Sequence, residues 1–149
     1  MKKIVLLSSI LLALLMSGCA SVPKASKEKD AAAKTFTAPT DGQSGIYIYR
    51  NSFVGQALKK NVYIDGKLVG ESSNKVFFYN QVAPGTHKLS TESEFSDNAL
   101  ELKTEAGKNY FVEQYIKMGA FVGGANLKVV SEADGKKEVL KCSLAKQKL

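Results

Sequence analysis

From Ser44 onward, apolar and polar residues alternate with a period of two, which is the pattern of β-strands that bury one face. Ile46 and Ile48 alternate with Tyr47 and Tyr49 in the first run. Similar runs recur with a turn signal roughly every eight to twelve residues, which predicts an all-β sandwich or barrel of about eight short strands. The runs that carry this prediction are 44–50, 62–64, 67–70, 76–79, 87–91, 99–103, 110–116 and 127–130.

Turn residues separate these runs. Asp65-Gly66 lies between two strand runs and predicts a tight type I′ hairpin, in which both central residues need positive φ. Pro84-Gly85 predicts another turn, because proline presets φ and glycine accepts φ > 0. Between the first two runs we expect a loop whose apolar residues, Phe53 and Val54, fold back onto the core.

The C-terminal segment permits two interpretations. Positions 139, 140, 143 and 144 form a helical face after a candidate cap at Asp134, whereas positions 140, 142 and 144 also alternate as in a strand. The abundance of Lys, Glu, Leu and Ala favours the helix. We therefore expect a short C-terminal helix packed over one end of the sheet.

The first 18 residues have the composition of an export signal. Lys2 and Lys3 form a basic start, and an apolar run from Ile4 to Met16 follows. Met16-Ser17-Gly18-Cys19 resembles the lipobox of bacterial lipoproteins, although leucine is the usual residue at the position of Met16. The resemblance implies cleavage after residue 18 and a Cys19 that carries diacylglycerol through a thioether, with fatty acyl chains of the palmitate type.

The residues after Cys19 suggest where the protein resides and how it is attached. In two-membrane bacteria an aspartate after the lipidated cysteine commonly signals inner-membrane retention, so Ala20 implies the outer membrane with the domain facing the periplasm. In a host with one membrane, the same anchor implies the outer face of the cell membrane. Residues 19–43 contain few apolar side chains, and we expect a flexible tether, followed by the sandwich domain over 44–149.

The order of motifs in the folded part resembles a bacterial lipoprotein family, domain-of-unknown-function family 2846. The motifs are Ile46-Tyr47-Ile48-Tyr49-Arg50, Val62-Tyr63-Ile64-Asp65-Gly66, Val82-Ala83-Pro84-Gly85-Thr86-His87 and Ala106-Gly107-Lys108-Asn109-Tyr110-Phe111. The two Gly-containing turns are also similar to PEGA-type β-sandwich repeats. These resemblances imply an Ig-like or PEGA-like β-sandwich of about seven or eight strands on a lipid anchor, and they bring no catalytic residues.

Composition and charge limit the classes of molecule that we expect this protein to bind. The formal charge is +7, but the lysines are scattered among acids and Arg50 is the single arginine. Nucleic-acid readers use clustered cations and favour arginine, whose planar fork pairs with phosphates and guanine edges. We therefore expect no nucleic-acid partner, and attachment to the membrane through the N-terminal lipid.

The residues that could perform chemistry are few. His87, the one histidine, follows a turn and is expected to be a turn or edge residue, and no metal-ligand spacing or nucleophile motif accompanies it. Cys142 is left without a disulfide partner if Cys19 carries lipid, and we expect a half-buried small apolar residue, with an intermolecular disulfide or a redox role as the alternative. The acidic segment with Glu92, Glu94 and Asp97 lacks EF-hand spacing and is expected to be a solvated loop. We expect no metal, no cofactor and no enzymatic activity.

Two apolar features suggest a binding surface instead. The strand tyrosines either form an exposed stripe suited to glycan stacking or fill a second half of the core. Phe121 and Val122 lie in an uncharged glycine-rich loop and are candidate partner contacts, unless the loop folds over the core. The sequence therefore favours a non-catalytic binding or structural module of the cell envelope, with an envelope protein or glycan as partner. A small accessory cell-wall hydrolase or inhibitor is the alternative.

Overall fold

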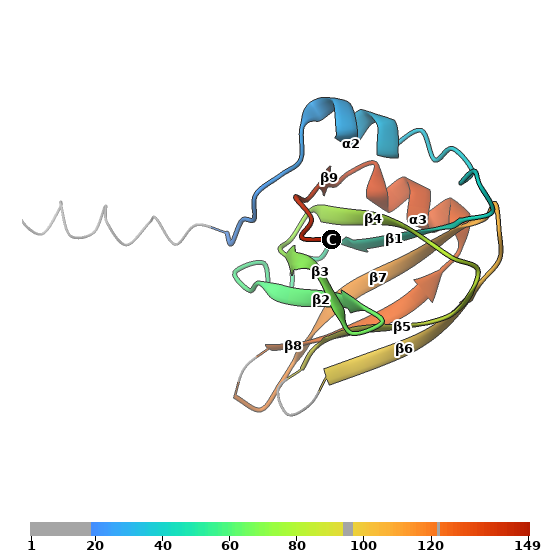
Figure 1. Ribbon diagram of the computed structural model, residues 1–149. Helices are drawn as coiled ribbons and strands as arrows, with labels where there is room; N and C mark the ends of the chain where they lie inside the picture. Colours follow the sequence, from blue (N-terminus) through green and yellow to red (C-terminus); the bar gives the residue numbers. More distant parts are fainter. Residues whose placement is uncertain (1–18, 94–96, 122) are drawn as a thin grey trace, which may run out of the picture.

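The computed structural model describes residues 19–93, 97–121 and 123–149. Two β-sheets lie face to face, and two short helices cover the outer side of one of them (Figure 1). This arrangement confirms the predicted all-β sandwich with a short C-terminal helix. In chain order the elements are α2 (Lys27–Ala33), β1 (Ser44–Arg50), β2 (Lys60–Ile64), β3 (Lys67–Ser72), β4 (Val76–Val82), β5 (Gly85–Glu92), β6 (Asp97–Thr104), β7 (Asn109–Met118), β8 (Gly123–Val130), α3 (Glu132–Val139) and β9 (Ser143–Leu144).

Strand β1 lies in the middle of the larger sheet. The strand order there is β8-β7-β1-β4-β9, and the smaller sheet has the order β3-β2-β5-β6. Strand β1 pairs antiparallel with β4 and parallel with β7, so Tyr47 stands between Tyr79 and Phe111. The first strand of the domain is therefore held by two partners from distant parts of the chain.

The turn between β2 and β3 is the predicted hairpin. Asp65 has a φ of 50° and Gly66 a φ of 77°, so both central residues occupy the left-handed region. Glycine adopts this region without strain, and aspartate tolerates it better than most residues. The Asp-Gly pair was therefore sufficient to predict this turn from the sequence.

Both faces of β1 are buried. Ile46 and Ile48 point into the core between the two sheets, whereas Tyr47 and Tyr49 point into a second apolar layer beneath the helices. The ring centroid of Tyr47 lies 4.9 Å from that of Phe111, and the two rings are stacked. The strand tyrosines were predicted either to form an exposed stripe or to fill a second half of the core, and Tyr47 and Tyr49 do the latter.

The segment before β1 differs from the predicted flexible tether over residues 19–43. Val22 is buried in the core between the sheets, and the amide of Ala25 donates to the carbonyl of Leu144 at 2.9 Å. The amide of Lys146 donates in turn to the carbonyl of Pro23 at 2.8 Å. The N-terminal and C-terminal segments therefore pair with each other along the edge of the larger sheet.

Helix α2 has no apolar face and is attached to the rest of the domain by hydrogen bonds and a contact between aromatic rings. A carboxylate oxygen of Asp30 accepts a hydrogen bond from the amide of Leu144 at 2.6 Å. The hydroxyl of Tyr47 donates to the carbonyl of Ala33 at 2.8 Å, and the ring of Phe36 lies 5.5 Å from that of Tyr47. One carboxylate and one aromatic ring thus dock a segment whose low apolar content predicted disorder.

The C-terminal segment contains both of the predicted alternatives in succession. Helix α3 begins after Ser131, whose hydroxyl accepts a hydrogen bond from the amide of Asp134 at 3.1 Å. Ser131 is therefore the N-cap, and the assignment of that role to Asp134 is corrected. The helix ends at Val139, and Ser143–Leu144 then forms β9 parallel to β4.

A buried polar network joins the two sheets. Gln114 of β7 is 1% exposed, accepts a hydrogen bond from Ser72 of β3 and donates to Thr91 Oγ1 of β5 at 2.7 Å. Thr91 donates onward to the carbonyl of Asn61 at 2.8 Å. Because each side-chain amide atom has a partner, the network fixes how the sheets face each other without an unpaired buried group.

The connections between strands gather at two opposite ends of the sandwich (Figure 1). We call the end at which β1 and β7 finish the Cys19 end; it includes residues 19–20, 51–59, 117–121 and 140–142. We call the opposite end the His87 end; it includes residues 65–66, 83–87 and 105–108. In Figure 1 the Cys19 end lies toward the left and the His87 end toward the right.

Candidate functional site

Cys19 lies at the surface, directly beside the β1–β2 loop. The amide of Ala20 donates to the carbonyl of Gln56 at 3.2 Å, and the Cys19 thiol lies 3.3 Å from Gln56 Oε1. Val22, three residues further on, is already in the core. A lipid on Cys19 would therefore leave the folded domain at its surface, without a flexible spacer. The predicted signal peptide, residues 1–18, lies outside the described residues.

The β1–β2 loop does not fold its apolar side chains onto the core as predicted. Phe53 is 83% exposed and Val54 is 45% exposed. The backbone of Gly55 instead lies against Ile116, so close that a Cβ at residue 55 would come within 2.7 Å of the isoleucine side chain. Because the glycine backbone takes the inward position, the preceding apolar side chains point to solvent.

The β7–β8 connection carries the candidate partner contacts. Phe121 is 87% exposed and Met118 is 81% exposed, so the alternative in which this loop covers the core does not apply to them. Val122 lies outside the described residues. The base of the hairpin contacts the β1–β2 loop, because Leu58 lies against the backbone of Gly123. Two apolar loops therefore lie together at the Cys19 end.

Arg50, the single arginine, is fully buried where β1 enters the β1–β2 loop. Its guanidinium donates to the carbonyl of Leu58 at 2.8 Å and to the carbonyl of Gly55. Within the described part of the chain it forms no ion pair, and burial lowers the pKa of the guanidinium to about 10. Arg50 thus holds the loop in one conformation by charge-assisted hydrogen bonds to its backbone.

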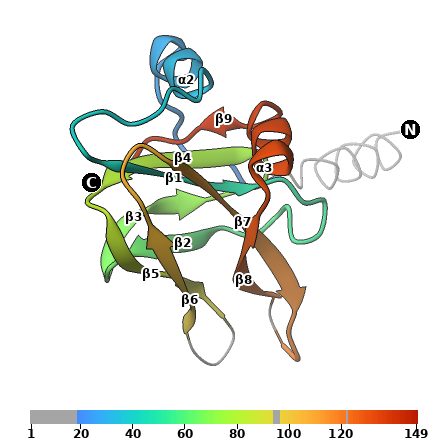
Figure 2. The same cartoon turned by 90° about the vertical axis from the view of Figure 1, so that its right-hand side faces the viewer.

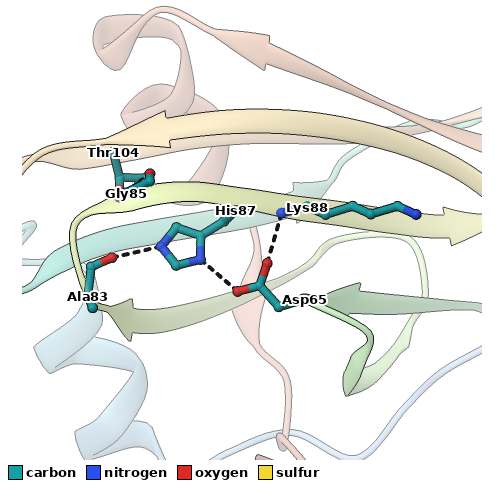
Figure 3. Close-up of polar contacts among 6 residues, drawn as sticks. All are labelled: Asp65, Ala83, Gly85, His87, Lys88 and Thr104. Atoms are coloured by element: carbon teal, nitrogen blue, oxygen red, sulfur yellow. Dashed lines mark hydrogen bonds and ion pairs between the residues drawn. The ribbon is translucent and has the colours of Figure 1, made fainter.

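His87 links two turns at the opposite end of the sandwich (Figure 3). Its Nδ1 lies 2.7 Å from Asp65 Oδ2 and its Nε2 lies 2.7 Å from the carbonyl oxygen of Ala83. The other carboxylate oxygen of Asp65 accepts from the amide of Lys88 at 2.9 Å. His87 itself is the third residue of β5, an inner strand of the smaller sheet, so the prediction of a turn or edge residue is wrong for its backbone. Its side chain contacts the two turns, and both of its ring nitrogens are already engaged.

The protonated imidazole fits this arrangement best, because it donates from both nitrogens. Burial lowers the pKa of His87, but the hydrogen bonds to Asp65 and Ala83 outweigh burial and raise this pKa above its ordinary value. The hydrogen bond from His87 lowers the pKa of the Asp65 carboxyl. The pair is therefore an electrostatic link between the β2–β3 and β4–β5 turns.

Cys142 is buried and not poised to react. Its thiol points toward the carbonyl oxygen of Arg50, with 3.7 Å between Sγ and O. Burial, with a smaller contribution from Glu138, raises the pKa of the thiol to about 12. Because the thiolate is the reactive form, the thiol is unreactive in these surroundings. Cys142 is buried more completely than the predicted half-buried residue, with 3% of it exposed.

The connection between β5 and β6 is shorter than the predicted acidic loop, because Glu92 is the last residue of β5. Glu92 accepts hydrogen bonds from the backbone amide of Asn61 at 3.1 Å and from its side chain at 2.9 Å, whereas Glu94 lies outside the described residues. Asp97 begins β6. Among the residues that the structure describes, no three His, Cys, Asp or Glu side chains come together in a way that could hold a metal ion.

A groove of about 550 Å³ lies between α2 and the larger sheet. A neighbouring hollow of about 570 Å³ shares Lys29, Tyr79 and Leu144 with it. The hydroxyl of Tyr79 accepts from Gln81 Nε2 at 3.3 Å. The side chains around the groove are mostly short and apolar or hydroxyl-bearing: Lys29, Ala32, Ala33, Thr35, Thr37, Ala38, Thr40, Tyr47, Tyr79, Gln81 and Leu144.

Sequence reasoning missed this groove because one of its walls comes from the presumed tether. An aromatic ring, an amide, hydroxyls and an ammonium group around one hollow are the groups that bind polar ligands such as glycans. No local pattern in residues 29–40 reveals the groove, since it exists only when α2 docks on β1 and β4. The alternation of the tyrosines was the one usable signal.

Residues 40–125 match the family described as Protein of unknown function (DUF2846). The chain belongs to this family. A protein of Haemophilus influenzae (strain ATCC 51907 / DSM 11121 / KW20 / Rd), named "Uncharacterized protein", is 58% identical over 138 residues, which cover 93% of this chain and 82% of that protein. No solved structure matches the chain. The DUF2846 match confirms the family resemblance of the strand and turn motifs, and it runs from just before β1 into β8.

Proposed function

We propose that this protein is a lipoprotein of the cell envelope, held to the outer membrane by acyl chains on Cys19 and facing the periplasm. The observation that supports the proposal is an exposed Cys19 at the first point where the chain meets the folded domain, after a lipobox-like Met16-Ser17-Gly18. Neither helix in the described residues is long and apolar enough to cross a membrane.

The domain acts as a non-catalytic binding or structural module. The groove beneath α2 supports this role, because it combines the half-buried ring of Tyr79 with the ammonium group of Lys29 and several hydroxyls. Aromatic rings stack on sugar faces, while amides and hydroxyls bond to sugar hydroxyl groups. We therefore assign an envelope glycan or a protein that carries one as the partner of this groove.

The anchor is tested by replacing each cysteine separately. Cys19→Ser abolishes incorporation of a labelled fatty acid and moves the protein out of the membrane fraction or leaves it unprocessed. Cys142→Ser is the matched control, because the buried thiol is not an acylation site, and it keeps both label and fractionation. Normal labelling and processing of Cys19→Ser would refute the lipoprotein assignment.

The binding role is tested on the groove. Tyr79→Ala reduces retention of the protein on isolated cell-wall sacculi, and Tyr63→Ala, a half-buried tyrosine of the other sheet, leaves retention unchanged. Thermal melts of both variants separate loss of binding from loss of folding. Equal retention of folded Tyr79→Ala and the unaltered protein would exclude the groove as the glycan site.

A further inference from the structure

The exposed apolar side chains are concentrated at one end of the molecule. Seven large apolar side chains are exposed among the described residues, and five of them lie at the Cys19 end. Single exposed apolar residues are normal on a soluble domain, but a concentration of them marks an interaction surface. The five are Phe53, Val54, Met118, Phe121 and Leu140.

The topology explains why these distant residues share one end. Strands β1 and β7 run parallel, so the loops that follow them, with Phe53 and Met118, leave the sheet on the same side. Gly55 contacts Ile116 near the end of β7, which joins the two loops. Leu140 follows α3, two residues before Cys142, which points toward the carbonyl of Arg50. Figure 1 shows the β1–β2 loop and the β7–β8 hairpin toward the left, whereas in Figure 2, which views the molecule from the opposite end, the hairpin lies at the bottom and the β1–β2 loop at the right.

We propose that the Cys19 end is a membrane-contact surface, which rests on a phospholipid bilayer with these apolar side chains at the headgroup–acyl boundary. This inference rests on the proposed acylation of Cys19. The hydrogen bond between Ala20 and Gln56 involves only backbone atoms, so it survives conversion of the thiol to a thioether. The acyl chains then emerge beside the β1–β2 loop and bring Phe53 to the bilayer with them.

Cations and carboxylates are mixed at this end. Exposed Lys59, Lys117 and Lys141 lie there, with Glu71, Glu92 and Glu138 nearby and two ion pairs, Lys59–Glu71 and Lys141–Glu138. The exposed apolar side chains, rather than a net charge, therefore carry the proposal. Lysine side chains keep their ammonium groups among lipid headgroups while their methylenes lie along apolar surface. In this orientation the His87 end faces away from the membrane, and the groove under α2 is left open to a partner in the periplasm.

The test places a fluorescent probe at each end of the lipidated full-length protein. Phe53→Cys, Met118→Cys and, at the opposite end, Thr86→Cys are each labelled with an environment-sensitive fluorophore and reconstituted into vesicles of phosphatidylethanolamine and phosphatidylglycerol. All three positions are exposed, so the labels do not disturb the core. The protein without an added cysteine measures any labelling of Cys142.

We expect doxyl-labelled phospholipid to quench the probes at positions 53 and 118 and to blue-shift their emission, with no quenching at position 86. Absence of quenching at positions 53 and 118, or equal quenching at all three positions, would overturn the membrane-contact surface. Mass analysis of the N-terminal peptide separates this result from failure of the anchor. A protein that carries no lipid refutes the proposed function, whereas a lipidated protein with unquenched probes refutes only the contact surface.

Discussion

Gly135→Ala tests how closely α3 must approach the larger sheet. Gly135 lies in the buried face of the helix, and a Cβ there would overlap the Cβ and Cγ of Phe111 and lie 2.6 Å from its Cδ1. Carbon atoms in contact normally lie about 3.5–4.0 Å apart, so the helix must move outward by about 1 Å. That movement loosens Val139, a fully buried residue on the same face of the helix.

Two opposing effects set the size of the change. Alanine stabilises a helix interior by about 1 kcal/mol relative to glycine. Overpacking of a tight core costs about 1–3 kcal/mol, and partial exposure of Val139 adds a fraction of its burial energy of about 1.5–3 kcal/mol. We therefore expect Gly135→Ala to lower the free energy of unfolding by about 1–2 kcal/mol, although alanine is the better helix former.

Urea unfolding followed by circular dichroism measures this difference. The matched control is Lys137→Ala, an exposed position in the same helix, which we expect to change the stability by less than about 0.5 kcal/mol. A midpoint for Gly135→Ala equal to or above that of the unaltered protein, with the same m-value, would show that α3 does not pack on Phe111 as described.

Three further predictions follow from the turns and the buried thiol. Gly66→Val places a β-branched residue at a φ of 77° and should lower the stability by more than about 1 kcal/mol; an unchanged melting midpoint would contradict the tight turn. His87→Gln should reduce stability most in mildly acidic solution: protonated His87 stabilises the fold fully below its ordinary pKa of 6.5, and this contribution disappears as the pH rises through its raised folded pKa. Asp65, whose folded pKa is lowered, contributes its stabilisation fully above its ordinary pKa of 3.8 and therefore throughout the range in which His87 titrates. The difference in stability between the unaltered and His87→Gln proteins, measured by urea melts, should therefore change with pH as His87 titrates. A difference that does not change with pH would argue against the pair. Cys142 should resist maleimide near neutral pH until the protein unfolds, and rapid modification of the folded protein would contradict its burial.

The turn chemistry could be predicted because it is local. Asp65 and Gly66 carry the whole hairpin signal in two adjacent residues, and the structure places both at positive φ. The alternation around Tyr47 likewise identified a strand, but not the number of faces it buries. A half-buried strand and a strand covered by helices on its second face show the same period of two, so only the docking of α2 and α3 distinguishes them.

The docking of α2 was beyond sequence reasoning for an energetic reason. It depends on Asp30, whose partner Leu144 lies 114 residues away, and on Phe36, one aromatic ring in a polar segment. Helix α2 is attached by a few specific contacts rather than by a continuous apolar face. Its sequence therefore shows no periodic apolar pattern from which docking could be predicted. Such contacts become visible only when the paired elements are placed together in space.

The candidate site divides in the same way between local and long-range information. Cys19 is recognisable as a candidate acylation site from four consecutive residues. The exposure of the apolar loop side chains is not recognisable in this way, because the sequence of a loop does not show the direction in which its side chains point. Arg50 decides the direction for the β1–β2 loop, since its buried guanidinium binds the carbonyls of Gly55 and Leu58 and fixes the backbone between them. With that backbone fixed and Gly55 against Ile116, Phe53 has no route to the core. Burial of a cation that forms no ion pair among the described residues is unfavourable by itself. Arg50 therefore lowers the stability of the core, and the hydrogen bonds of the same side chain hold the loop in its outward conformation.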